Sequence, residues 1–157
     1  MNDVRACEPK LVISVKPGSE KRIRLDLLDA LYPLDKDLQV DIIRGGLAVY
    51  SHLDPDTLCD TLKKFPIRGI VSVKKVIAWV ELNETERVAE AIAAKAIAKG
   101  FKFSRVEIKS RGSTIARKIE ACLKNVLRSK GLLNRNGVAV HVEFLGDLAA
   151  LTVKVAN

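Results

Sequence analysis

The stretch EIKSRGSTIARK (107–118) surrounds one glycine–serine pair with four cations. The cations are Lys109, Arg111, Arg117 and Lys118, and the pair is Gly112 and Ser113. Glycine permits a tight turn and serine is favoured at helix starts, so the stretch predicts a strand end, a turn and the first turns of a helix. A helix start is already partly positive and normally attracts acidic residues, but this one has none. Free backbone N–H groups, a hydroxyl and basic side chains together are typical of an anion-binding site.

Other helix starts in the chain help to interpret this one. DPDTLCDTLKK (54–64) and NETERVAEAIAAKAIAK (83–99) place acids early and lysines late, as the helix dipole favours. GSEKRIR (18–24) also enters through Gly-Ser, but Glu20 supplies the expected acid, so we interpret Ser19 as an ordinary helix cap whose neighbouring cations reach water. For GSTIARK, an ordinary serine cap with cations that reach water remains the alternative, and we favour an anion.

The helix predicted over residues 113–130 extends the cationic character of this stretch and ends at Gly131. An apolar stripe is expected on one side of it, made of Ile115, Ile119, Cys122, Val126 and Leu127. Arg117, Lys124 and Arg128 fall opposite that stripe, within roughly 40° of one another at 100° per residue. On the preceding strand, Arg105 and Lys109 alternate away from the apolar positions. Such a row of cations suits successive phosphates better than one small anion, and RNA backbone is the expected source.

Charge is concentrated in the same part of the chain. The net charge is +8, and residues 95–135 hold 12 basic residues against Glu107 and Glu120. A one-sided excess of this kind indicates a polyanionic partner. Charge by itself would fit a solvated basic face equally well.

The order of predicted elements indicates an α+β fold in two domains. Strands are expected over 11–16, 38–43, 47–52, 68–82, 104–109, 137–144 and 148–155. Helices are expected from Gly18 to Pro33, over 54–64, from Asn83 to Gly100 and over 113–130. Ile97 lies opposite the apolar face of the third of these, which could therefore be two short helices. The order in residues 1–82 suits a ferredoxin-like sandwich, and residues 83–157 form a second α/β unit.

Signatures of catalysis and of metal binding are missing from the sequence. The three cysteines have no CxxC spacing, which suggests a reducing cytoplasm, and Cys59 and Cys122 are expected in the core. His52 and His141 are the two histidines, and each falls in a predicted strand. No nucleotide loop, nucleophile elbow or zinc motif is present. We therefore expect no enzyme activity in the chain alone, no cofactor, no metal and no membrane span or signal peptide.

Several stretches resemble a known family. FKFSRVEIKSRGSTIARKIEACLKNVLRSKGL, followed by GVAVHVEF and LAALTVKV, is similar to a THUMP domain. LVISVKPGSEKRIRLDLLDAL, GGLAVY and FPIRGIVSV are similar to the ferredoxin-like domain that precedes THUMP in tRNA-modifying proteins. The resemblance implies binding of tRNA at its acceptor stem and 3′ end.

The resemblance also implies a role and a set of binding residues. Because no catalytic domain is fused here, the closest parallel is the stand-alone THUMP adaptor that assists a separate cytidine acetyltransferase. The implied contacts are Lys109, Arg111, Arg117 and Lys118, with Gly112 and Ser113 shaping the turn. A catalytic subunit completed by another chain, and a module that meets an acidic protein, are the alternatives.

Overall fold

The computed structural model describes residues 7–81, 85–98, 103–108, 114–131, 138–145 and 148–155. The chain forms two compact units. Unit 1 comprises Met1–Val76 with Val155–Asn157, and unit 2 comprises Ile77–Lys154. The domain bounds predicted from the sequence, 1–82 and 83–157, stay a prediction. None of the helices among the described residues is long and apolar enough to cross a membrane.

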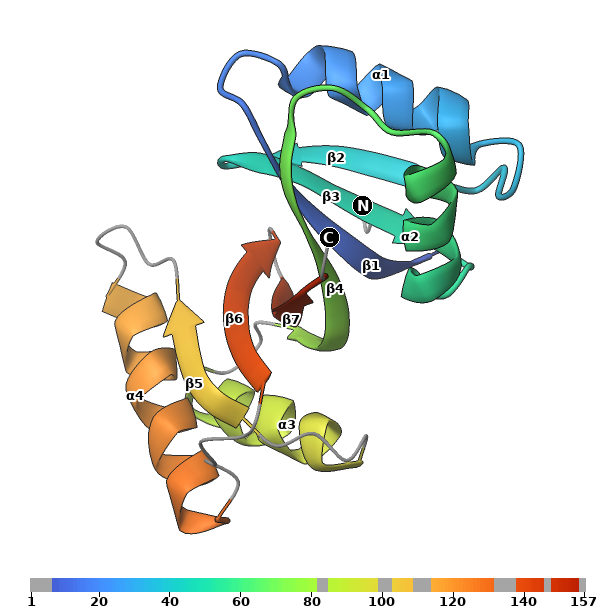
Figure 1. Cartoon of the computed structure of the whole chain (residues 1–157). Coiled ribbons are helices and arrows are strands. Elements are labelled where there is room, and N and C mark those ends of the chain that lie inside the picture. The colour runs from blue at the N-terminus through green and yellow to red at the C-terminus, as the bar shows by residue number, and fades with distance from the viewer. Residues whose placement is uncertain are drawn as a thin grey trace, which may run out of the picture. The chain divides into compact units, whose positions relative to one another are not determined.

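Unit 1 alternates strands and helices in the order β-α-β-β-α-β (Figure 1). Its elements are β1 (Glu8–Val15), α1 (Glu20–Leu31), β2 (Gln39–Ile43), β3 (Gly46–Ser51), α2 (Pro55–Lys64) and β4 (Ile70–Glu81), the last of which continues into unit 2 at Ile77. The sheet order is β2-β3-β1-β4, and each of these pairs is antiparallel. The hairpin between β2 and β3 turns at Gly45, whose φ of 83° is a conformation that glycine adopts without strain.

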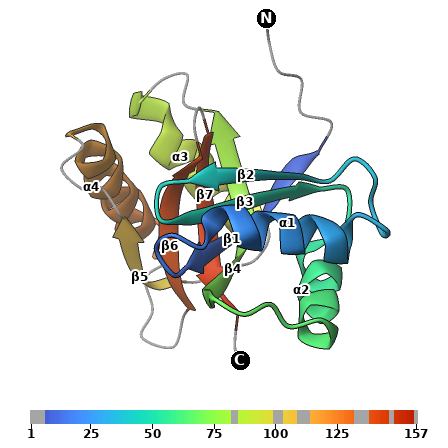
Figure 2. The same ribbon diagram turned by 90° about the horizontal axis from the view of Figure 1, so that it is seen from above.

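Both helices of unit 1 pack on one face of this sheet. Figure 2 shows α1 lying over β1 and β3. Ile23, Leu27 and Leu31 recur at four-residue spacing along α1 and are fully buried, because side chains four apart share a helix face. They share a core cluster with α2 residues and with alternate strand positions such as Leu11 and Ile13.

The start of α2 is fixed by its capping residue. Asp54 Oδ1 accepts a hydrogen bond of 2.7 Å from the backbone N–H of Thr57, and Pro55 occupies the first helical position. A carboxylate there satisfies an otherwise unpaired N–H group and also favours the positive helix start. The helix predicted over 54–64, with acids early and lysines late, is confirmed.

Unit 2 contains two helices and the remaining strands. Its elements are the end of β4, α3 (Thr85–Ala98), β5 (Phe103–Ile108), α4 (Thr114–Ser129), β6 (Val138–Leu145) and β7 (Leu148–Lys154). β5 pairs with β6 in parallel and β6 with β7 antiparallel. Buried residues of both helices and of β6 and β7 form one core cluster, including Ala93, Ile119, Leu123 and Val140.

The types of the predicted helices and strands agree with the structure, and one predicted helix differs in its continuity. The α+β class is confirmed, and each predicted helix and strand is present, with its described bounds within a few residues of expectation. The alanine-rich segment is one helix, α3, so the division into two short helices is wrong. Ile97 simply lies on the exposed side of a continuous helix, 40% exposed. The predicted Asn83 start and Gly100 end lie outside the described residues.

Candidate functional site

Helix α4 buries apolar side chains on one face and exposes basic side chains on the opposite face. Ile119, Leu123 and Leu127 are buried at four-residue spacing, and Val126 is half-buried beside them. Arg117, Lys124 and Arg128 are exposed. At 100° per residue these three lie within roughly 40° of one another and 100° or more from Leu123. We call Arg117, Lys124 and Arg128 the cationic ridge.

The structure corrects one member of the apolar stripe. Cys122 was expected in the core, but its side chain is exposed, whereas Leu123 is 1% exposed. The reason is angular: Ile119, Leu123 and Leu127 centre the buried face, and Cys122 lies roughly 100° from Leu123 around the helix. The prediction for Cys59 is confirmed, because it is buried, and burial raises the pKa of its thiol. A buried thiol with a raised pKa is a poor nucleophile.

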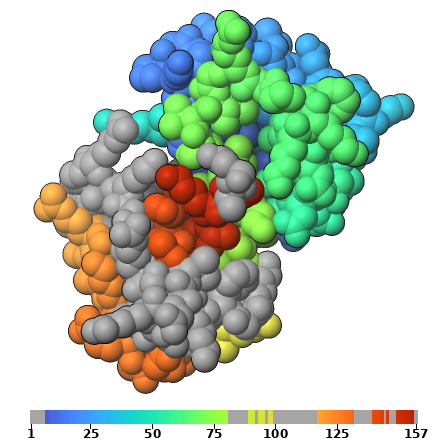
Figure 3. Space-filling view, in the orientation of Figure 1, coloured from blue at the N-terminus to red at the C-terminus, as the bar shows by residue number. Residues whose placement is uncertain are grey.

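One acid interrupts the basic side of α4. Glu120 Oε1 lies 3.1 Å from Lys124 Nζ, in an i,i+4 pair whose side chains are 28% and 46% exposed. Glu120 is the acidic residue of the helix, and the first turn has none. Exposed pairs of this kind contribute little to stability because water screens them. Lys124 can therefore exchange Glu120 for another anion at small cost. Figure 3 shows atoms of α4 at the surface of unit 2, in orange.

The turn that precedes α4 falls outside the described residues. Lys109, Arg111, Gly112 and Ser113 all belong to it, and the side chain of Arg105 in β5 is also outside them. Lys118 is described and exposed, about 100° around the helix from Arg117. The structure therefore places Arg117, Lys118, Lys124 and Arg128 on the exposed surface of one helix. The contribution of the turn stays a prediction.

Helix α1 also begins after a Gly-Ser pair, and the structure shows which groups lie at its start. The Glu20 carboxylate accepts a hydrogen bond from the backbone N–H of Gly18, with oxygens at 3.1 and 3.3 Å. The expected cap is wrong: Ser19 makes no side-chain capping bond, and its hydroxyl instead donates to the carbonyl of Lys16. A carboxylate of the chain itself therefore binds the backbone just before this helix start. The contrast agrees with our choice of α4, which has no acid in its first turn.

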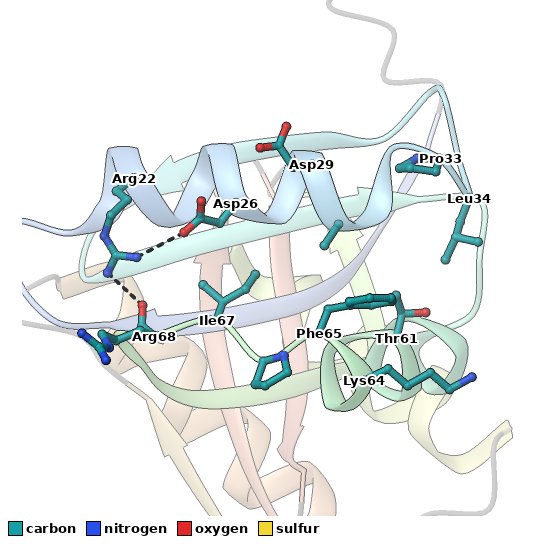
Figure 4. Close-up of a pocket in the computed structure, with 12 residues that line it drawn as sticks. Arg22, Asp26, Asp29, Pro33, Leu34, Thr61, Lys64, Phe65, Ile67 and Arg68 are labelled. Atoms are coloured by element: carbon teal, nitrogen blue, oxygen red, sulfur yellow. Dashed lines mark hydrogen bonds and ion pairs between the residues drawn. The ribbon is translucent and has the colours of Figure 1, made fainter.

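Unit 1 carries a pocket that no sequence pattern indicated. It has a volume of about 880 Å³ and lies between α1, the end of α2 and the segment that follows α2 (Figure 4). Arg22 donates to Asp26 Oδ2 and to the carbonyl of Arg68, at 3.1 and 2.8 Å. With Lys64, Arg68 and Asp29, the lining has three basic and two acidic side chains. This mixed lining attracts phosphate less than the cationic ridge does, so we assign the nucleic-acid candidate to α4.

A third group of chemically capable side chains lies elsewhere in unit 1. One ligand atom each from Cys7, Asp35 and His52 lie within 4.8 Å of one another. No metal site was expected from the sequence. The spacings of 28 residues from Cys7 to Asp35 and 17 residues from Asp35 to His52 form no motif that could have suggested one. His52 was expected inside a strand, but it follows the last residue of β3 and its ring contacts Asp37 Oδ2 at 3.1 Å. His141 lies within β6 as predicted.

Comparisons with known proteins show the fold. No protein-family model matches the sequence, and no curated protein matches it. Among solved structures, PH1313 from Pyrococcus horikoshii Ot3 is 15% identical with a TM-score of 0.58, over 94% of this chain and 55% of its own. TrmN from Thermus thermophilus is 21% identical with a TM-score of 0.60, over 96% of this chain and 46% of its own.

A further structural neighbour was solved with nucleic acid. It is a 4-thiouridine synthetase in complex with RNA and bound ATP, 18% identical with a TM-score of 0.56, over 94% of this chain and 41% of its own. The chain thus spans between 41% and 55% of the length of these three structures. At these identities the likeness concerns the fold, and it extends over nearly all of this chain.

Proposed function

We propose that this chain is a non-catalytic tRNA-binding protein. It recognises the acceptor stem and 3′ end and presents the tRNA to a separate modifying enzyme, such as a cytidine acetyltransferase. The observation that carries the proposal is the cationic ridge on α4, with Lys118 beside it and Glu120 as the acid of that helix. Rows of cations bind phosphates without sequence preference and orient the nucleic acid on the protein.

The fold supports the same proposal. The β-α-β-β-α-β order of unit 1, with sheet order β2-β3-β1-β4, is the order expected of a ferredoxin-like domain. We assign unit 2 to the THUMP family on the stretches that resemble it. One neighbour of this fold, the 4-thiouridine synthetase, was crystallised with RNA. We place the protein in the cytoplasm, where its three unpaired cysteines would stay reduced.

A catalytic subunit completed by another chain is the second candidate. The observation in its favour is that this chain corresponds to 41% of the 4-thiouridine synthetase, which is an enzyme. In that case tRNA binding by α4 would be retained, and turnover would require the partner chain.

The binding proposal is tested by reversing charge in the turn before α4. Lys109→Glu combined with Arg111→Glu should abolish tRNA binding in a filter or gel-shift assay and leave the circular dichroism spectrum unchanged. For single reversals, each cation that no longer neutralises a phosphate should flatten the log–log salt slope by about 0.7–0.9.

A matched control keeps the change in net charge and moves it elsewhere. Arg44→Glu combined with Lys63→Glu reverses two exposed cations of unit 1. This variant should keep most of its tRNA affinity. Equal reductions of affinity in both double variants would mean that net charge, and no localised site, causes binding; unchanged affinity in the folded Lys109/Arg111 variant would remove the turn from the site.

A further inference from the structure

Three segments of unit 1 that are distant in the sequence bring different metal-binding side chains together. Cys7 immediately precedes β1, Asp35 lies in the connection between α1 and β2, and His52 follows β3. The Sγ atom, a carboxylate oxygen and a ring nitrogen of these residues lie within 4.8 Å of one another. Asp37 joins the group, because its Oδ2 lies 3.1 Å from His52 Nε2 and its carbonyl accepts a 3.4 Å hydrogen bond from the Cys7 thiol.

The group holds more negative than positive charge. Asp35 and Cys7 are each 8% exposed. Within the described part of the chain, no lysine or arginine donates a hydrogen bond to the carboxylate of Asp35 or Asp37. Buried charges in proteins are generally paired or bound to a metal ion. The Asp35 carboxylate is buried whereas the Asp37 side chain is 65% exposed, so a divalent cation would chiefly balance the buried charge of Asp35.

We propose that unit 1 binds one Zn²⁺ ion through the thiolate of Cys7, a ring nitrogen of His52 and the carboxylate of Asp35. Sulfur, imidazole nitrogen and carboxylate oxygen are the ligand types of zinc, whereas magnesium and calcium select oxygen alone. Three protein ligands leave the fourth tetrahedral position to a water molecule or, after it moves, to the neighbouring Asp37 carboxylate.

The distances are close to those that tetrahedral coordination requires. Zinc bonds of about 2.0–2.3 Å place neighbouring ligand atoms about 3.3–3.7 Å apart. The 3.1 Å between His52 Nε2 and Asp37 Oδ2 is slightly shorter than this range, as is usual for a hydrogen bond. The separations among the Cys7, Asp35 and His52 ligand atoms, all within 4.8 Å, must close by at most about 1 Å. His52 can supply that movement, because its side chain is 51% exposed.

Hydrogen bonds hold the Asp35 carboxylate in place for this role. Its Oδ2 accepts bonds from the Ser51 hydroxyl at 2.7 Å and the His52 N–H at 2.8 Å, and its Oδ1 accepts from the Asp37 N–H at 3.0 Å. Ligating carboxylates are commonly oriented by such secondary contacts. Burial and the nearby Asp35 and Asp37 carboxylates raise the pKa of the Cys7 thiol, an effect that a bound cation opposes. Binding would therefore fasten the start of β1 to the α1–β2 connection and the end of β3.

The test uses Co²⁺ as a spectroscopic substitute for Zn²⁺ on the full chain, reduced and treated with chelator beforehand. One equivalent of Co²⁺ should produce the near-ultraviolet charge-transfer band of a thiolate–cobalt bond, and one equivalent of Zn²⁺ should remove it. Cys7→Ser should lose the band, and His52→Asn should weaken binding by at least about tenfold, the lower range seen even for residues that only support a ligand. Cys122→Ser removes an exposed thiol far from the cluster in sequence and should behave as the wild type.

Each outcome decides the proposal. A band lost in Cys7→Ser and kept in Cys122→Ser, together with a higher Tm in Zn²⁺ that Cys7→Ser lacks, supports the site, because a ligand that binds the folded state stabilises it. Absence of a band in the wild type, a band that survives Cys7→Ser, or a band lost in Cys122→Ser would each overturn it. Circular dichroism and Tm in chelator establish that each variant is folded before it is scored.

Discussion

Single residues of α4 determine the charge of the surface that we propose for RNA binding. Lys124 is held by Glu120 at 3.1 Å, but both side chains reach solvent, so the pair is weak and reversible. Glu120 also places a negative charge beside a surface that we propose for phosphate. Its effect on RNA should therefore be larger than its effect on folding.

We predict that Glu120→Gln strengthens tRNA binding by about 1.4- to fivefold at low salt, which corresponds to the 0.2–1 kcal/mol of an exposed pair. The free energy of unfolding should change by less than about 0.5 kcal/mol. Titrations by fluorescence anisotropy would measure the first, and urea unfolding the second. Asp60→Asn removes an equal charge from an exposed position of α2 and should leave affinity unchanged; weaker binding by Glu120→Gln would contradict the placement of RNA on this face.

The capping residue Asp54 gives a prediction about pH. The backbone N–H of Thr57, then its side chain, donates to this carboxylate and holds the Asp54 pKa below its ordinary value of 3.8. A carboxyl group whose pKa is lower in the folded state stabilises it above the unfolded pKa, and this contribution is lost as the pH falls through the folded pKa. Asp54→Ala should therefore lower the Tm near neutral pH, and its difference from the wild type should shrink below pH 3.8.

Serine at the same position separates capping from charge. Asp54→Ser retains an oxygen that can accept from the helix N–H groups, so it should keep most of the Tm near neutral pH. The stabilisation that the cap provides in Asp54→Ser should not change as the pH falls. A difference between the wild type and Asp54→Ala that stays constant down to the lowest pH would show that the charge of Asp54 has no part in the cap.

At the scale of helices and strands, α4 has a buried apolar face and an exposed basic face on opposite sides. Leu123 is packed in the core of unit 2 while the adjacent Cys122 is exposed, a difference of one position and about 100°. Because the core anchors one face, the opposite face and its cationic ridge are held outward. A substitution on the buried face would therefore affect the orientation of the cationic ridge as well as the stability of the protein.

Adjacent substitutions on α4 test this assignment. Leu123→Ala should reduce the free energy of unfolding by about 2–5 kcal/mol, because a buried leucine leaves a cavity when truncated. Cys122→Ala should change it by less than about 0.5 kcal/mol, as is usual at the surface. Urea unfolding of the two variants measures both values. Similar reductions in both would mean that the helix is rotated relative to the assignment given above.

For the molecule as a whole, the solved structures that share its fold are longer than this chain. It spans 41–55% of three of them, one of which is an enzyme in complex with RNA and ATP. Within the described residues, the cluster of Cys7, Asp35 and His52 lies in unit 1, whereas the cationic ridge lies in unit 2. The proposed function assigns RNA binding to this chain and the chemistry to a separate enzyme.

We predict that the pure protein binds tRNA and makes no modified nucleoside. Incubation with unmodified tRNA and common group donors, followed by nucleoside analysis, should give no product. Native extract fractions that co-purify with the protein should restore the modification. Turnover by the pure chain would refute the adaptor role and favour the catalytic alternative, while leaving the binding proposal intact. Removal of the tRNA 3′ tail should reduce competition for binding if the 3′ end is recognised.

Local patterns were the part of this structure that could be predicted. The helix over 54–64, the neighbouring strands over 38–43 and 47–52, and the division of α4 into apolar and basic sides depend on residues within about one helical turn or one hairpin of one another. The Cys122 error arose at the edge of such a pattern. Periodicity gives the direction of a face, but the neighbours that cover it decide where burial ends.

Propensity, capping and side-chain periodicity act along a continuous segment, and they were enough to predict the order of helices and strands, the α+β class and the concentration of cations on α4. Only the packed molecule reveals that Cys7, Asp35 and His52 meet and that Leu123 is buried in place of Cys122. The same is true of Arg22, whose guanidinium reaches the Arg68 carbonyl beside a pocket. These contacts depend on strand pairing and helix packing between distant segments, which no pattern in neighbouring residues encodes.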